Sequence, residues 1–165
     1  MQVDQEQRDA VYAAVGKALQ QAQHYEEAFK YFARVAARIE PQGPAAREFG
    51  ELVPRPDKQT LGFLLGVFKR HVRISDPGIP EMLQAAAHTR KLLAHSFFLE
   101  GDRGNLIADE DGRRSMLMDL DGMEALLRKA GNMMRAMGSV LEETIDGTRT
   151  KSTGPGLFSM EIDEL

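Results

Sequence analysis

The chain has 165 residues, of which 42% are hydrophobic and 28% are charged, and this balance suits one domain with an apolar core and a well-solvated surface. Its formal net charge of −4 excludes the strongly basic character of many nucleic-acid-binding domains, so contact with nucleic acid would require a local basic patch. The chain contains no cysteine, which excludes disulfides, thiolate zinc sites and thiol nucleophiles.

The first residues and the apolar runs both argue against a membrane protein. The N-terminal sequence MQVDQEQRDAVY is polar and acidic, unlike a signal peptide. The longest apolar run, LGFLLGVF at residues 61–68, is much shorter than the roughly 20 residues that a membrane-spanning helix needs. We therefore expect a soluble, cytoplasmic protein without a membrane partner.

Apolar residues spaced three and four apart predict one long helix from about Asp4 to Ile39. Pro41, Gly43 and Pro44 then end it, because proline removes a backbone donor and clashes with a continuing helix. The apolar row along this helix consists of Val11, Val15, Ala18, Ala22, Tyr25, Phe29, Phe32, Val35 and Ile39. One face of the helix should therefore lie in the core.

Two further helices and several turns are expected between residues 44 and 100. Gly62 and Gly66 stand four apart in the first of these helices, so one of its faces is nearly bare backbone. We expect that face to contact another helix closely, with a ligand site as the alternative. The segments are, in order, one or two short turns at 44–52, a proline-containing loop at 53–59, a helix capped by Thr60 over 61–74, a turn at 75–80 and a helix from Pro80 to Glu100.

A last long helix is predicted from Arg113 to Ile145, after a polar loop at 101–112 with a short turn at Leu106–Ile107. Its seam residues alternate steps of three and four, which is typical of long packed helices. Three glycines in this helix either permit close packing or mark kinks. The seam is Leu120, Met123, Leu127, Ala130, Met134, Met137 and Leu141, and the glycines are Gly122, Gly131 and Gly138.

The fold class that follows is all-α, an up-down helical bundle of four to five helices that forms a single domain over residues 1–146. No strand pattern and no internal repeat is evident. Residues 147–165 show no periodicity, so we expect a flexible C-terminal tail, or one ordered against a partner chain. The acidic residues of the loop at 101–112 do not match a calcium-binding loop, and no metal site is predicted there.

Arg90 lies at the centre of the apolar stripe of the helix over 80–100, where an unpaired charge is costly. On an ideal wheel of 100° per residue, its stripe neighbours are Leu83, Ala86, Ala87, Leu93, Ala94, Phe97 and Phe98. His95 falls about 140° away, in a polar strip that also contains His88 and Lys91. His88 and His95 are about 10.5 Å apart along the axis, too far to share a metal ion. Arg90 therefore needs a partner, which is a carboxylate, the carbonyl groups at a helix end, or solvent reached by the head of its side chain.

The segment from Arg90 to His95, RKLLAH, matches the R-x4-6-H motif of the HEPN superfamily, the higher eukaryote and prokaryote nucleotide-binding domains. The chain resembles this family over roughly residues 8–146. VGKALQQAQHYEEAFKYF resembles its long first helix and TLGFLLGVFKRHV its second. LLAHSFFLEGD and DGRRSMLMDLDGMEALLRKAGNMM resemble its motif helix and its last helix.

This resemblance implies a homodimer through the motif helices, in which Arg90 and His95 of two subunits form one composite catalytic cleft. It implies a metal-independent endoribonuclease of a toxin–antitoxin or phage-defence system, with no cofactor and with an antitoxin or nucleotidyltransferase acting in trans. His95 would be the general base on a ribose 2′-hydroxyl. Arg90 would bind the scissile phosphate and stabilise its developing charge.

Lys91, His88 and Arg70 are the predicted contacts to phosphate groups of RNA, within a basic set that also includes Lys69, His71 and Arg73. Lys91 stands where active members often carry Asn or Asp, and it either adds a phosphate contact or marks a member without catalysis. Two alternatives stay open beside the nuclease. One is a non-catalytic HEPN-like module that binds nucleotide, RNA or a protein. The other is a helical interaction protein in which Arg90 and His95 are structural.

Overall fold

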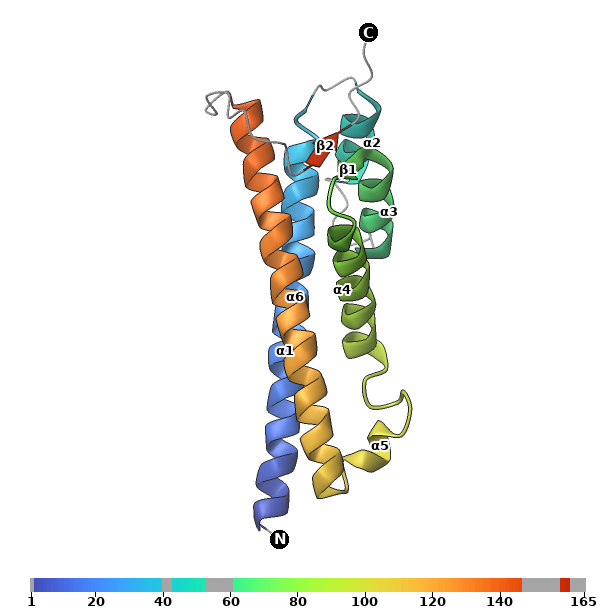
Figure 1. Ribbon diagram of the computed structural model, residues 1–165, viewed down its shortest axis with the longest axis vertical. Coiled ribbons are helices and arrows are strands. Elements are labelled where there is room, and N and C mark those ends of the chain that lie inside the picture. Colours follow the sequence, from blue (N-terminus) through green and yellow to red (C-terminus); the bar gives the residue numbers. More distant parts are fainter. Residues whose placement is uncertain (1, 40–42, 53–60, 147–157, 161–165) are drawn as a thin grey trace.

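The computed structural model of the protein describes residues 2–39, 43–52, 61–146 and 158–160 (Figure 1). It confirms an all-α helical bundle, with three long helices and three shorter ones in the described part of the chain. The elements are α1 (Gln2–Ala36), α2 (Pro44–Leu52), α3 (Leu61–His71), β1 (Val72–Ile74), α4 (Gly78–His95), α5 (Arg103–Leu106), α6 (Glu110–Ile145) and β2 (Phe158–Met160).

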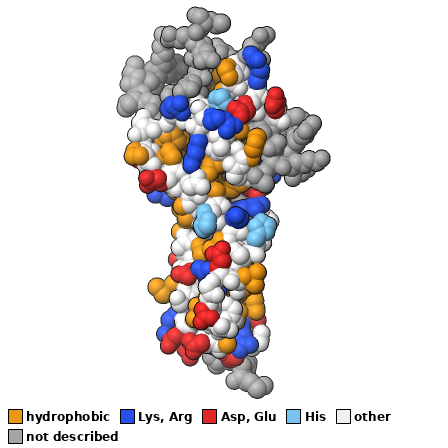
Figure 2. Space-filling model, turned by 90° about the vertical axis from the view of Figure 1, so that its right-hand side faces the viewer, with side chains coloured by type: hydrophobic (Ala, Val, Ile, Leu, Met, Phe, Trp, Pro, Cys, Tyr) orange, Lys and Arg blue, Asp and Glu red, His pale blue; other side chains and the backbone are white. Residues whose placement is uncertain are grey.

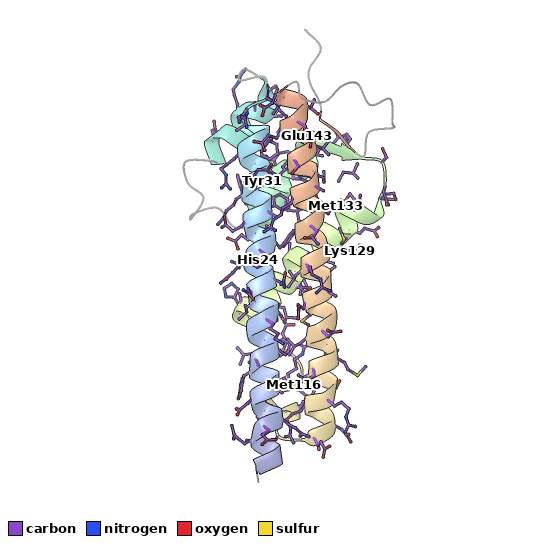
Figure 3. The ribbon with its side chains drawn as sticks, turned by 90° about the vertical axis from the view of Figure 1, so that its left-hand side faces the viewer. His24, Tyr31, Met116, Lys129, Met133 and Glu143 are labelled. Carbon is purple, nitrogen blue, oxygen red and sulfur yellow. The ribbon has the colours of Figure 1, made fainter. Side chains whose placement is uncertain are left out.

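The two longest helices, α1 and α6, pack side by side and run parallel (Figures 1 and 3). At one end, the Arg113 guanidinium donates to the Gln7 side-chain oxygen at 2.9 and 3.1 Å, across 106 residues. At the other end, Arg38 donates to Glu142 and Asp146, both at 2.8 Å, across 104 and 108 residues. The nearly constant separation in sequence means that the two helices stay in register along their whole length.

The third long helix, α4, runs in the opposite direction to α1 (Figure 1). The Tyr25 hydroxyl donates to the Leu83 carbonyl oxygen at 2.9 Å, whereas the ring of Tyr12, earlier in α1, lies 5.8 Å from that of Phe98, which follows the end of α4. Residues that come later in α1 therefore meet residues that come earlier on the α4 side. The long helices α1, α4 and α6 thus alternate in direction along the chain, as the up-down topology requires.

Two glycines of α6 let it approach α1 closely. A Cβ atom on Gly138 would lie 2.5 Å from Cε1 of Tyr31, and one on Gly131 would lie 3.4 Å from the Cα of Tyr25. A Cβ on Gly122 would meet nothing within 4 Å. Close packing therefore explains the first two glycines but does not explain Gly122. The core between the helices is formed mainly by the predicted apolar rows, of which Phe29, Phe32, Leu120, Leu127, Ala130 and Met134 are almost fully buried.

Local hydrogen bonds explain where the helix bounds differ from the prediction. The Asp109 side chain accepts from the Gly112 amide at 3.0 Å, so α6 begins three residues before Arg113. The Asp76 side chain accepts from the Gly78 amide at 2.8 Å, and α4 begins there, two residues before the predicted start. Ser96 leaves the helical conformation, with φ −145° and ψ 9°, so α4 ends five residues before the expected end.

The expectation of an uninterrupted helix over 61–74 and of no strand was wrong. β1 (Val72–Ile74) pairs antiparallel with β2 (Phe158–Met160), with Val72 opposite Met160. Two β-branched residues flank Arg73 in β1, a pattern that suits a strand once a partner supplies the hydrogen bonds. This pairing attaches part of the predicted tail to the domain. The predicted loop at 53–59, the Thr60 cap and the rest of the tail lie outside the described residues.

Two smaller expectations also changed. The segment 44–52 forms one helix, α2, and the short turn in the polar loop lies at 103–106, one to three residues before its predicted position. Among the described helices, none combines the length and the apolar character that crossing a membrane requires.

Candidate functional site

A groove of about 710 Å³ lies between α3 and α4 and collects most of the predicted site residues. Figure 2 views the molecule from this side and shows Lys, Arg and His side chains gathered where its broad part narrows. The residues that line the groove are Leu61, Gly62, Leu65, Gly66, Lys69, Gln84, Ala87, His88, Arg90, Lys91 and His95. They recur every three or four residues, because each helix presents one face to the groove.

Four of the five predicted site residues line this groove: Arg90, His95, Lys91 and His88. The wheel placed His95 about 140° from Arg90, yet both reach the groove. A long Arg side chain accounts for this, because its stem can follow the apolar stripe while its head extends to the edge. The motif pair and two of the three predicted phosphate contacts are therefore neighbours in one cavity.

Arg70, the fifth predicted residue, does not line the groove. Its guanidinium hydrogen-bonds to the Glu48 carboxylate of α2, and His71 Nε2 lies 2.6 Å from the other oxygen of that carboxylate. Hydrogen bonding from Arg70, and then from His71, lowers the pKa of Glu48. Arg70 thus has an acidic partner within the chain, and its place in the structure is a link between α2 and α3.

Arg90 finds its partner on α1. Its Nε and Nη2 atoms donate to Oε2 of Glu26 at 3.2 and 2.9 Å, and the other Glu26 oxygen lies 3.3 Å from Lys30 Nζ. The side chains of Arg90 and Glu26 are 33% and 20% exposed. A carboxylate of the same chain therefore compensates the charge of Arg90 on the apolar stripe of α4. The position of Arg90 can be explained without a second subunit.

Three groove residues on α4 face solvent. His88, Lys91 and His95 are exposed, and within the described part of the chain they form no ion pair or side-chain hydrogen bond. His95 is the last residue of α4, where the negative end of the helix dipole favours a positive charge. On α3, Lys69 Nζ donates to the Gln84 side-chain oxygen at 2.6 Å and so spans the groove near one end.

The groove is positively polarised within an acidic protein. No carboxylate is among its lining residues in the described chain, and Glu26, the carboxylate that pairs with Arg90, also contacts Lys30. A negatively charged ligand in this groove would be attracted by its lysines and Arg90, and Lys91 could bind it by a charge-assisted hydrogen bond, with the ring nitrogens of His88 and His95 as further hydrogen-bonding groups. No three His, Asp or Glu side chains of the described residues gather in a way that could hold a metal ion.

Sequence reasoning missed Glu26 and Gln84 and did not place Lys69 among the site residues. Glu26 is 64 residues from Arg90, and no local pattern marks it as the partner. Lys69 and Gln84 had a usable signal, since each continues the three- and four-residue spacing of its helix into the groove. Comparison of the chain with protein-family models, with curated proteins and with solved structures gave no match.

Proposed function

We propose that the protein is a HEPN-like helical domain that binds RNA through the groove between α3 and α4. One observation carries the proposal: five basic side chains from two helices, Lys69, His88, Arg90, Lys91 and His95, line one cavity that no described carboxylate lines. This is the local basic patch that an acidic protein needs for contact with a polyanion. We name RNA as the polyanion because the RKLLAH segment resembles the motif of the HEPN superfamily.

The exposed groove residues and Arg90, whose charge Glu26 compensates, have different roles in this proposal. Lys91 and the two histidines are exposed and contact the phosphate groups directly. Arg90 is held by Glu26 through Nε and Nη2, which fixes the plane of its guanidinium and leaves Nη1 for a ligand. Glu26 is therefore a positioning residue, and binding does not require Arg90 to give up its ion pair.

A second candidate function is metal-independent cleavage of the bound RNA, favoured by the presence of Arg90 and His95 in the same groove. In this reaction His95 takes the proton of a ribose 2′-hydroxyl, and the 2′-oxygen attacks the adjacent phosphorus. The bond from phosphorus to the 5′-oxygen breaks, that oxygen takes a proton from water, and a 2′,3′-cyclic phosphate remains. Arg90 stabilises the charge that builds on the phosphate. A homodimer through the exposed face of α4 would place two such grooves together.

The binding proposal is tested by fluorescence anisotropy with a labelled single-stranded RNA in EDTA, over a series of salt concentrations. Lys91→Ala is expected to weaken binding and to reduce the salt dependence by about one released counterion. Lys129→Ala is the matched control, because Lys129 is an exposed lysine of α6 on another side of the molecule (Figure 3). Equal effects of the two substitutions, or no binding by the wild type, would refute the proposal.

The cleavage candidate needs a separate readout. The same RNA is incubated with protein in EDTA, and the products are resolved by size and tested for a 2′,3′-cyclic phosphate end. His95→Ala is expected to abolish cleavage while binding falls by less than ten-fold, because only one of several phosphate-contacting side chains is lost. Wild-type protein that binds RNA but leaves it intact would reject the nuclease and keep the binding function.

A further inference from the structure

Basic residues are concentrated where α3 ends and β1 begins. This basic end of α3 consists of Lys69, Arg70, His71 and Arg73. One carboxylate, that of Glu48, serves both Arg70 and His71, whereas Lys69 hydrogen-bonds to the uncharged Gln84. Lys69 therefore has no carboxylate partner among the described residues, and its positive charge remains uncompensated at one end of the groove that it lines.

Arg70 adjoins the same end of the groove. Its Nη1 atom lies 3.9 Å from the position that a Cβ atom on Gly66 would take, and Gly66 lines the groove. The side chain of Arg70 is 54% exposed, so its guanidinium can accept a further carboxylate beside that of Glu48. The basic end of α3 is thus open to an acidic partner.

The second strand brings a distant part of the chain to this basic end. β1 and β2 are antiparallel, with Ile74 opposite Phe158 and Val72 opposite Met160. Val72 directly follows the last residue of α3, so β2 runs toward the end of that helix and Met160 lies beside it (Figure 1). The residues that follow Met160 in the sequence therefore start next to the basic end of α3.

Those next residues are acidic. The segment 161–165 has the sequence EIDEL, with three carboxylates and no basic residue, and it lies outside the described residues. Five residues can extend over about 17 Å, while Lys69 is only about one helical turn from the end of α3. A connection this short gives the segment an effective concentration of the order of millimolar at the basic end, so that even weak ion pairs form.

We propose that the acidic segment 161–165 docks on the basic end of α3 and covers the adjoining end of the groove. Its carboxylates pair with Lys69 and Arg70. A pair of three-residue strands is only marginally stable by itself, and this docking adds stability to the pairing of β1 with β2. The docking does not depend on RNA binding. Its consequence rests on the proposed function, because RNA that enters the groove at Lys69 must displace the segment.

The test measures how fast an amine-acetylating reagent modifies each lysine, by mass spectrometry of the full chain. The tail variant carries Glu161→Gln, Asp163→Asn and Glu164→Gln. Exposed ion pairs are individually weak, so we expect a docked fraction of about four-fifths, and Lys69 should react about five-fold faster in the tail variant. The difference should vanish near 1 M salt. Lys129, an exposed lysine of α6, should react equally in both proteins.

A control variant removes the same number of negative charges far from β1. It carries Glu110→Gln, Asp111→Asn and Asp121→Asn, three exposed positions in the first part of α6 (Figure 1). Equal Lys69 rates in the wild type and the tail variant, or the same acceleration in the control variant, would overturn the docking. Protection of Lys69 that disappears on dilution would overturn docking within one chain and assign the contact to a second copy.

The consequence for RNA binding has its own readout. In the anisotropy titration, the tail variant is expected to bind the labelled RNA about five-fold more tightly than the wild type and the control variant do. Equal affinities would overturn the competition between segment and RNA. If no variant binds RNA while Lys69 is still protected in the wild type, the docking stands and the proposed function fails.

Discussion

Gly138→Ala should destabilise the protein although alanine favours helices. The added Cβ would lie 2.5 Å from Cε1 and 2.8 Å from Cδ1 of Tyr31, well inside normal carbon contact distances of about 3.5–4.0 Å. The Tyr31 ring must therefore move, and its hydroxyl donates to Oε2 of Glu142 at 2.7 Å. Overpacking costs about 1–3 kcal/mol and the lost hydrogen bond about 1 kcal/mol. The higher helix propensity of alanine stabilises the variant by about 1 kcal/mol, so the free energy of unfolding should fall by about 1–3 kcal/mol in total.

The measurement is urea unfolding followed by circular dichroism, with linear extrapolation to water. Gly122→Ala is the control in the same helix, and because its Cβ meets nothing within 4 Å it should stabilise the protein by about 0.5–1 kcal/mol. For a chain of this size, 1 kcal/mol corresponds to roughly 2–4 °C in Tm. If the Gly138 variant were as stable as the Gly122 variant, α1 and α6 would not approach each other in this register.

Three further predictions concern ion pairs and a buried hydroxyl. In a double-mutant cycle, Glu26→Gln and Arg90→Met should show a coupling of about 1–2 kcal/mol in unfolding free energy, reduced by partial exposure, and a value near zero would contradict the ion pair. Tyr25→Phe should cost about 0.5–1.5 kcal/mol at neutral pH. Burial raises the pKa of Tyr25 far above its usual value, so wild-type stability should fall as the pH rises above ~10 and the variant should lack this part of the fall. The pKa of Glu48 is lowered, so its contribution is present above pH ~4.3 and lost as the pH falls further, and acid titration of Glu48→Gln should show a smaller loss.

The long helices were predictable because their signal is repeated many times. The row from Val11 to Val35 and the row from Leu120 to Leu141 each repeat the helical spacing over several turns, so single exceptions do not obscure the pattern. The short strand was not predictable in this way. Val72–Ile74 follows a helix directly, and the residues that pair with it, Phe158–Met160, are 84 to 88 positions further along the chain. Three residues carry too little periodicity to outweigh the helix that precedes them.

The candidate site was predicted in part for the same reason. Arg90, Lys91, His88 and His95 belong to one helix, so they lie within about two turns of each other, although the wheel placed His95 about 140° from Arg90. The cavity itself requires α3 to lie beside α4, and Glu26 requires α1 to lie behind both, which are tertiary facts without a local signature. The glycines show most clearly what the sequence alone does not predict. Gly66, Gly122 and Gly138 look equivalent in the sequence, yet one lines the groove, one faces solvent and one contacts Tyr31.

The parallel register of α1 and α6 has a consequence for how the chain folds during synthesis. A residue of α1 meets its partner on α6 about 106 positions later, and at ribosomal rates of roughly 5–20 residues per second the partner emerges about 5–20 s after it. During that time the aromatic row of α1, including Phe29 and Phe32, lacks the helix that later buries it. Nascent chains that stop before α6 should therefore aggregate or bind chaperones, and folding should be slower than for bundles whose neighbouring helices are consecutive in sequence.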